Sequence, residues 1–587
     1  MSNPVTPGVP VSPGPGGASG PDLAGKDGRR PTIDIVNASL GRRYRAERRF
    51  RFIGMRAVVI GLAFVAVLFA DIIGKGYSAF QQTYIRLWGA FPAEAIDPEG
   101  PRDPAVLRAA NSLKLARAAL AARFPDVTRR ADKQALYGLL SAGAPQQLRE
   151  RVLADPGIIG TTQEIWLLAD DDSDMFMKGR STPIDIQRGM GLASLVPVDG
   201  GEDHQVPVLS TANDFRAILT DLADYRDEDQ AAAPEAAPGA QEVLGPDLPS
   251  HLVAINGGLI KVERATPSDV TGTLLKPLTT DLDALPGQWA TMRFATPEND
   301  RRLKDLVVAW LYDLGAAGDI EKRFKPGFFT QGASREPELA GIAGALMGSF
   351  YPLALTLLLS FPVGVGAALY LEEFAPRNWF TDLIEVNINN LAAVPSIIFG
   401  LLGLAVFINF FGIPRSTPLV GALVLTFMTL PTIIIASRSA LQSVPPSIRE
   451  AALGVGASPL QTQFHHVLPL AIPGMLTGAI LGMARALGET APLLMIGMVA
   501  FIVDTPSGFL SPATVLPVQV YLWADSPEVG FVERTSAAIL VLLAFLAVMN
   551  LAAPHMGGRG EPPLPGELPL PPGPAPNSGV PCYERDR

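Results

Sequence analysis

The chain has 587 residues, of which 48% are hydrophobic and only 18% charged, and its mean hydropathy is +0.25. This composition excludes an ordinary large soluble protein. The net charge of −10 is the sum of a basic amino-terminal segment and a long acidic insert, so the total says little about the fold. A single cysteine, Cys582, excludes an intrachain disulfide and a cysteine-based metal site, and the adjacent His465 and His466 point to different faces of a helix. We therefore expect no metal site and no cofactor bound by this chain.

The amino-terminal segment, residues 1–50, opens with a stretch rich in Pro, Gly and Ser and is predicted to be disordered. Seven arginines between Arg42 and Arg56 surround the start of an apolar run, which predicts a transmembrane anchor helix at residues 51–73. The positive-inside bias places this basic terminus in the cytoplasm. Because lipid headgroups explain the arginines, no nucleic acid is expected as a partner.

Residues 74–336 contain no run of membrane length, and short amphipathic pieces alternate there with acidic loops. The stretch Leu107–Phe124 predicts a helix, and Leu252–Val262 has the alternating, β-branched pattern of strands. We expect a mixed α+β soluble domain on the periplasmic side of the membrane. The composition of Asp227–Pro246 predicts a flexible excursion within it.

Four aspartates between Asp170 and Asp174 invite comparison with a calcium-binding loop. However, Met175 stands where an EF-hand needs glycine, and Ser181 stands where it needs a bidentate glutamate. A solvated acidic loop is the better interpretation. No catalytic constellation is recognisable in this domain.

Five further apolar runs follow within residues 337–553, and together with the anchor they predict six spans and an all-α polytopic membrane domain. These runs are Ile342–Leu371, Ile384–Phe411, Pro418–Ala436, Leu468–Met498 and Ala537–Leu551. Six spans place the carboxy-terminal tail, residues 554–587, in the cytoplasm, where its Pro-rich composition predicts disorder. The 372–383 loop opposes this topology, because it carries Glu372 and Glu373 although it should be cytoplasmic. Arg438, at the end of the fourth span, is interpreted as a headgroup anchor.

The loop between the fourth and fifth long runs carries the signals of a helical hairpin. Ser447 and Glu450 have the spacing of a capping box, and so do Ser458 and Gln461. Gly454 and Gly456 lie between the two predicted helices, and Pro469 is expected to limit the second helix. The second helix carries an apolar ridge made of Leu460, Phe464, Val467 and Leu468. A hairpin of this kind is suited to docking against a partner.

This loop, residues 444–470, resembles the EAA loop of ABC importer permeases. The resemblance rests on Glu450, Ala451, Ala452, Gly456, Leu468 and Pro469. It implies a type I importer permease whose loop docks into a dimer of ATPase subunits, and it implies that the partner hydrolyses ATP. No phosphate-binding loop occurs in this chain, so we expect no enzymatic activity.

Three further motifs resemble the phosphate importer permease of the PstA type. They are Leu371–Pro376, Val394–Ile397 and Arg485–Pro492. The resemblance covers about residues 340–553 and implies a second homologous permease subunit, a periplasmic phosphate-binding protein and inorganic phosphate as partners in a bacterial inner membrane. It does not cover the 74–336 domain. That domain is too acidic to favour an anion, so we expect it to contact the binding protein or the companion permease instead.

The fifth span itself suggests a substrate path. Gly474, Gly478 and Gly482 recur at helical spacing and predict close helix packing, and Arg485 and Glu489 fall on the same face. An arginine within a membrane is costly, and its planar fork suits an oxyanion. The alternative is that the Arg485–Glu489 pair merely locks helix packing.

Two other functions remain open at this point. A permease for sulfate or molybdate would also need an arginine-lined path. A membrane sensor or scaffold is a further alternative, although such a protein needs fewer spans and a cytoplasmic output domain.

Overall fold

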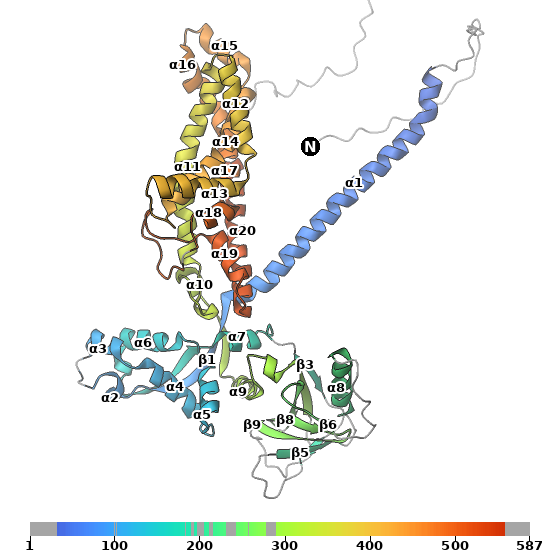
Figure 1. Ribbon diagram of the computed structural model, residues 1–587, viewed down its shortest axis with the longest axis vertical. Helices are drawn as coiled ribbons and strands as arrows, with labels where there is room; N and C mark the ends of the chain where they lie inside the picture. Colours follow the sequence, from blue (N-terminus) through green and yellow to red (C-terminus); the bar gives the residue numbers. More distant parts are fainter. Residues whose placement is uncertain are drawn as a thin grey trace, which may run out of the picture. The chain divides into compact units, whose positions relative to one another are not determined.

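The computed structural model describes residues 32–557, except for 99, 101, 182–183, 189–192, 196–204, 211–214, 230–241, 256, 277–288 and 500. The chain divides into two compact units, residues 1–70 and 71–587. Helix α1, Thr32–Gly76, forms most of the first unit (Figure 1). The expectation of disorder over residues 1–50 is therefore wrong from Thr32 onward, and residues 1–31 lie outside the described part. Helical spacing brings Arg51 within 2.6 Å of Glu47, one turn away.

The membrane domain, residues 343–557, is all helical, and the predicted fold class is confirmed. Within the described residues, five helices are long and apolar enough to cross a membrane, and a bent pair of helices can form a sixth span. After α1, the long helices are α11 (Ala343–Leu369, continued by the π-helix η5, Tyr370–Phe374), α14 (Pro418–Ser443), α17 (Leu468–Gly488) and α20 (Val529–Gly557). The bent pair consists of α12 (Trp379–Ala392) and α13 (Ser396–Leu402), which continues as η6 (Gly403–Phe410).

Two predicted spans are broken. The run Ile384–Phe411 bends by 103° between α12 and α13, because Pro395 cannot donate a backbone hydrogen bond and restricts the residue before it. The run Leu468–Met498 ends as a helix at Gly488, and the short helix α18, Ala491–Met495, follows separately.

The last span begins eight residues before its predicted start at Ala537. Helix α20 starts at Val529 and therefore includes Glu533 and Arg534, both of which are buried. The short helix α19, Leu516–Ala524, precedes it. Two charges inside the first turns of a span need protein partners, which the soluble domain supplies.

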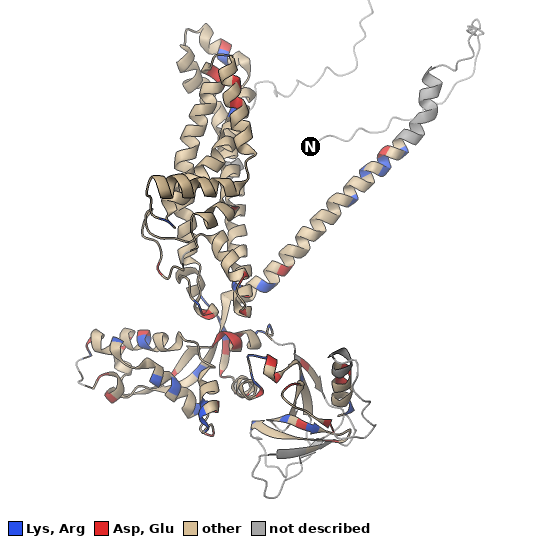
Figure 2. Cartoon of the chain, viewed as in Figure 1, with Lys and Arg blue, Asp and Glu red and all other residues tan. Residues whose placement is uncertain are grey.

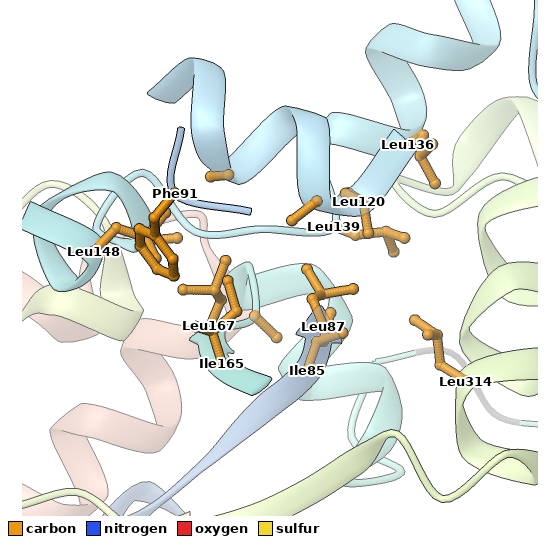
Figure 3. Packing of buried hydrophobic residues seen from close by; sticks show 14 of the residues in the cluster. Ile85, Leu87, Phe91, Leu120, Leu136, Leu139, Leu148, Ile165, Leu167 and Leu314 are labelled. Atoms are coloured by element: carbon orange, nitrogen blue, oxygen red, sulfur yellow. The ribbon is translucent and has the colours of Figure 1, made fainter. Parts of the chain in front are cut away.

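The soluble domain, residues 77–339, contains a three-stranded antiparallel sheet with the order β11-β1-β2. The first 3-10 helix, η1 (Tyr77–Phe80), leads into β1 (Gln81–Ala90), which pairs with β2 (Thr162–Leu168) and β11 (Ile320–Phe324). Alternate residues of β1, among them Ile85 and Leu87, are buried. They pack with Leu120, Leu167 and Leu314 in one hydrophobic core (Figure 3).

Helices cover this sheet, and the one predicted at Leu107–Phe124 is in fact two. Helix α3 spans Pro104–Ala109 and α4 spans Ser112–Arg123. The break arises because Asn111 caps α4, its side chain accepting a hydrogen bond from the Lys114 N–H at 3.1 Å. Further helices of the domain are α2 (Ala93–Ile96), α5 (Arg130–Tyr137), α6 (Ala144–Ala154), α7 (Asp171–Met177), α9 (Asp305–Ala316) and α10 (Gly327–Thr330).

A second antiparallel sheet has eight strands, with β6 attached to β8 and the others in the order β3-β10-β7-β8-β9-β5-β4. The strands predicted at Leu252–Val262 are confirmed as the hairpin of β7 and β8. The turn between them uses Gly257 at φ +75°, a conformation that glycine adopts without strain. Helix α8, Arg216–Asp229, belongs to the same part, and most of the predicted flexible excursion lies outside the described residues. The strands are β3 (Ile184–Arg188), β4 (Ala193–Leu195), β5 (Gln205–Ser210), β6 (Glu242–Val243), β7 (Pro249–Ile255), β8 (Gly258–Ala265), β9 (Asp269–Lys276) and β10 (Trp289–Pro297).

The acidic stretch at Asp170–Asp174 is not a solvated loop, and that expectation is wrong. Asp170 caps α7, and Asp171 and Asp174 are buried. The Asp174 carboxylate accepts hydrogen bonds from the Thr83 hydroxyl at 2.6 Å and from the Thr83 N–H at 2.9 Å. Aspartates at the amino-terminal end of a helix are favoured by its dipole, which explains why this sequence folds as a helix.

A buried polar network, which we call the junction network, joins the soluble domain to α20. Lys178 pairs with Asp174 at 2.7 Å and with Glu533 of α20 at 3.1 Å. Next to it, Arg534 donates to the Ala79 carbonyl at 2.7 Å and to the Gln82 side-chain oxygen at 2.6 Å. Because all four charged side chains are almost fully buried, each depends on its partners for compensation. The junction network comprises Ala79, Gln82, Thr83, Asp174, Lys178, Glu533 and Arg534.

Asp171 lies beside this network, against the first turn of α20. A Cβ atom on Gly530 would come within 2.0 Å of the Asp171 carboxylate, so any larger residue there would displace the Asp171 side chain. Burial, followed by the nearby carboxylates of Glu338 and Asp174, raises the pKa of Asp171 to about 8 from its ordinary value of 3.8.

We predict that Asp171→Asn stabilises the protein more at high pH than at low pH. The raised folded-state pKa means that ionisation of Asp171 opposes folding, so its contribution to stability falls as the pH rises from about 4 to about 8 and is constant above that range. Asparagine has no such dependence. Thermal unfolding of the full-length protein and the variant at about pH 5 and about pH 9 measures the difference. An equal shift in melting temperature at both pH values would contradict the prediction.

Candidate functional site

The predicted docking loop folds as a helical hairpin, which we call the coupling hairpin. It comprises α15 (Pro446–Gly454), a turn, α16 (Pro459–Thr462) and the π-helix η7 (Gln463–Val467). The capping box of Ser458 and Gln461 is present, with its two hydrogen bonds at 3.2 and 3.0 Å. In the turn, Gly456 has φ +91°, which a residue with a side chain rarely adopts.

Two local expectations for this hairpin are wrong. Ser447 does not cap α15, because the helix already begins at Pro446 and its N-cap residue is Pro445. Pro469 does not end the second helix, which continues from η7 directly into α17. The widened π turn just before Pro469 accommodates the missing backbone donor of the proline.

Most of the predicted coupling residues lie on the surface of the hairpin. Glu450, Ala451, Gly456 and Pro469 are exposed, whereas Ala452 is buried and Leu468 is half-buried. The predicted apolar ridge is divided, because Leu460 and Phe464 are exposed while Val467 is fully buried.

Two exposed apolar residues on the hairpin were not identified from the sequence. Leu453 is 49% exposed and Val455 is 86% exposed. With Leu460 and Phe464 they give the hairpin four large apolar side chains on its surface. The sequence signal for them was the presence of apolar residues at the carboxy-terminal end of the short helix α15. These four side chains are open to contact with another chain.

Charged residues gather near the coupling hairpin, whereas the helices of the membrane domain, residues 343–557, are nearly free of charge over most of their length (Figure 2). The Glu372 carboxylate accepts hydrogen bonds from Gln442 at 3.0 Å and from Arg438 at 3.2 Å. Arg438 also pairs with Glu385 at 2.7 Å, so it is not simply the headgroup anchor that we expected. The neighbouring Glu373 pairs with Arg449 of α15 at 2.7 Å.

These ion pairs explain the unexpected acidity of the 372–383 loop. Its two glutamates compensate arginines that are distant in the sequence, so the acidic residues do not indicate on which side of the membrane the loop lies. Glu372 and Glu373 lie at the same end of the membrane domain as the coupling hairpin.

The predicted packing glycines of α17 lie against α14. A Cβ atom on Gly474 would come within 2.9 Å of the Ala440 Cβ, and one on Gly478 would come within 2.2 Å of the Ala436 Cβ. At Gly482 the nearest atoms, on Ile433 and Thr429, are at ordinary contact distance. The first two glycines therefore allow an approach that any larger residue would prevent.

Arg485 lies in the last turn of α17, and Glu489 is the residue that caps its carboxy-terminal end. Their closest charged atoms, Arg485 Nε and Glu489 Oε1, are 3.6 Å apart, and the arginine side chain is 51% exposed. Because Gly482 still faces the middle of α14, Arg485 lies within the length of the membrane helices. The cation is favoured there by the helix dipole, and it is available to a ligand or to another chain.

The short helix that follows the break after α17 packs against the helix that follows the break before α13. Gly400 of α13 approaches Pro492 of α18 so closely that a Cβ atom would be 2.7 Å from the Pro492 Cα. Interrupted helices at membrane depth are tolerated where they are covered by protein or line a water-filled cavity. Arg485 and Glu489 thus lie just before α18, which packs against α13.

No group of three or more potential metal ligands occurs among the residues that the structure describes. Near Arg485, the guanidinium and the Glu489 carboxylate provide hydrogen bonding and charge pairing.

Two family models match the chain. The model of the binding-protein-dependent transport system inner membrane component matches residues 360–558. A domain of unknown function (DUF3333) matches residues 37–184, which include β1 and α7.

Curated relatives match the chain over about the same length as the membrane domain. The probable ABC transporter permease protein YqgI of Bacillus subtilis is 34% identical over 244 residues, covering 39% of this chain and 82% of the relative. The phosphate transport system permease protein PstA of Haemophilus influenzae is 31% identical, covering 38% of this chain and 78% of the relative. The permease protein PstC of the same organism is 30% identical, covering 34% and 70%. The chain therefore belongs to the family of ABC transporter permeases, the inner membrane components of binding-protein-dependent transport systems.

Proposed function

We propose that this chain is the permease subunit of an ATP-driven phosphate importer and forms half of its translocation path. The similarity to phosphate transport permeases of the PstA type carries the proposal. The exposed coupling hairpin and the half-exposed Arg485 within the membrane helices support it.

The orientation follows from the arginines before the first span. With the amino terminus in the cytoplasm, the soluble domain lies outside the cytoplasm, and the coupling hairpin and the carboxy terminus lie inside. The partners are then a dimer of ATPase subunits, a second homologous permease and an extracytoplasmic phosphate-binding protein. This chain binds no cofactor of its own, and the ATPase subunits hydrolyse the ATP.

The soluble domain is proposed to contact the binding protein or the companion permease rather than to bind phosphate. Its attachment to α20 through Lys178 and Arg534 supports a role within the assembled transporter. A free-standing sensor would not need a buried connection to a membrane helix.

The substrate is tested by uptake. Cells that lack this protein should take up labelled phosphate at least about ten-fold more slowly than complemented cells, as expected when an essential subunit is missing. Uptake of labelled sulfate and molybdate should be unchanged. Loss of sulfate or molybdate uptake with normal phosphate uptake would favour the alternative oxyanion permease.

We predict that Glu450→Lys and Gly456→Pro each prevent docking of the ATPase while the protein still inserts into the membrane. The first reverses an exposed charge, and the second places a residue with φ fixed near −65° where the chain has φ +91°. Recovery of the ATPase on co-purification should fall about ten-fold or more, the effect of losing roughly 1.4 kcal/mol of binding energy. Gly454→Ala, at a glycine with open space around it, is the matched control. Normal recovery with both variants would refute the docking assignment.

We predict that Arg485→Lys lowers phosphate uptake about ten-fold, because it keeps the charge but loses the planar pair of donors. The double variant Arg485→Leu, Glu489→Gln removes the pair without leaving an unpaired charge, so the subunit should still assemble. Uptake and complex yield are measured side by side in the same membranes. Failure of the double variant to assemble, together with normal transport by Arg485→Lys, would make the pair a packing device.

A further inference from the structure

The Glu373 carboxylate is the point where three elements at the hairpin end of the membrane domain converge. It lies in η5, which continues α11. One oxygen accepts hydrogen bonds from Arg449 of α15, at 2.7 Å from Nη2 and 3.1 Å from Nε. The other oxygen accepts from the Gln463 side-chain amide of η7 at 2.6 Å. Glu373 therefore holds both helices of the coupling hairpin at once.

The hydrogen bonds of Glu373 with Arg449 and Gln463 form a polar joint. Arg449 connects this joint to α14. Its guanidinium also donates to the carbonyls of Leu441 and Val444, at 2.9 and 2.8 Å. These carbonyls belong to the carboxy-terminal end of α14, where no further helical turn supplies donors. The guanidinium thus uses all three nitrogens, and its side chain is only 22% exposed.

The connectivity of the chain gives this joint its importance. The hairpin is linked through the backbone to α14 on one side and to α17 on the other. Helix α11 has no such link, because α12 and α13 intervene in the sequence. Within the described residues, the side-chain hydrogen bonds between the α11–η5 helix and the hairpin are those of Glu373.

Apolar packing surrounds the polar joint and limits independent movement. Leu371, beside Glu373, belongs to one buried cluster with Leu441, Val444 and Val467. A displacement of the hairpin would therefore have to break the hydrogen bonds of Glu373 or carry α11 with it. Breaking them would leave a partly buried carboxylate and a partly buried guanidinium unpaired, which is costly.

We propose that Glu373 is a positioning residue that transmits the displacement of the coupling hairpin to α11. The inference rests on the proposed function, since it requires that an ATPase moves the hairpin. In this inference, one carboxylate couples the coupling hairpin to α11, a span that has no direct backbone link to the hairpin.

The experiment uses the full transporter complex with labelled phosphate as the probe, and it measures phosphate taken up per ATP hydrolysed. Glu373→Ala should keep the ATPase at its normal ratio and should hydrolyse ATP, but uptake per ATP should fall about ten-fold, within the range typical of coupling between sites. Glu373→Gln should keep at least about half of the wild-type value. Glutamine still accepts from Arg449, and the Gln463 oxygen, which has no hydrogen-bond partner among the described residues, can turn to accept from it.

Two further variants complete the design. Asp382→Ala removes an exposed acid at the same end of the membrane domain and is the matched control, with uptake per ATP unchanged. Gln463→Ala removes one of the two connections to Glu373 and should lower uptake per ATP by a smaller factor. If the Glu373→Ala complex fails to assemble, Gln463→Ala provides the test in its place.

The outcomes separate this inference from the proposed function. Wild-type complexes that neither bind the ATPase nor take up phosphate would refute the proposed function. Wild-type complexes that do both, with unchanged uptake per ATP in Glu373→Ala, would overturn the role of Glu373 alone. Unchanged uptake per ATP in Gln463→Ala would do the same if Glu373→Ala does not assemble.

Discussion

The requirement that every backbone polar group in a hydrocarbon layer finds a partner within the protein governs the rest of this structure. It makes the membrane domain helical and confines irregular backbone to places where protein covers it. The breaks at Ala393–Pro395 and after Gly488 lead into α13 and α18, which contact each other through Gly400 and Pro492. The two short helices that follow the interruptions thus cover part of each other, and Arg485 and Glu489 lie at the end of α17 that leads to α18.

Charge is concentrated where helices must be held without a backbone connection. At the hairpin end, Glu372 and Glu373 of η5 pair with Arg438 and Arg449, which lie 66 and 76 residues further along the chain. Near the amino-terminal end of α20, Glu533 pairs with Lys178, which lies 355 residues earlier in the chain. Buried ion pairs add little net stability, but breaking one is expensive, so they fix a single arrangement of the elements that they join.

The junction network fixes the soluble domain to α20 of the membrane domain. The matched domain of unknown function, residues 37–184, includes Gln82, Thr83, Asp174 and Lys178, which are the side chains that the soluble domain contributes to this network. Helix α20 in turn packs against α17, which carries Arg485. Helix α20 therefore contacts both the soluble domain and the helix that carries Arg485.

The sequence by itself determined those features that depend on neighbours along the chain. Run length and apolarity located the spans, glycine spacing indicated which face of α17 packs closely, and Ser458 with Gln461 gave a capping box that the structure contains. Tertiary structure decided the features that depend on residues far apart. Ser447 does not cap because the helix starts before it, Asp171 and Asp174 are buried because α7 packs against α20, and the glutamates of the 372–383 loop are compensated by distant arginines. Local hydrogen bonds and periodicity are written in adjacent residues, whereas burial and ion pairing depend on which surfaces folding brings together.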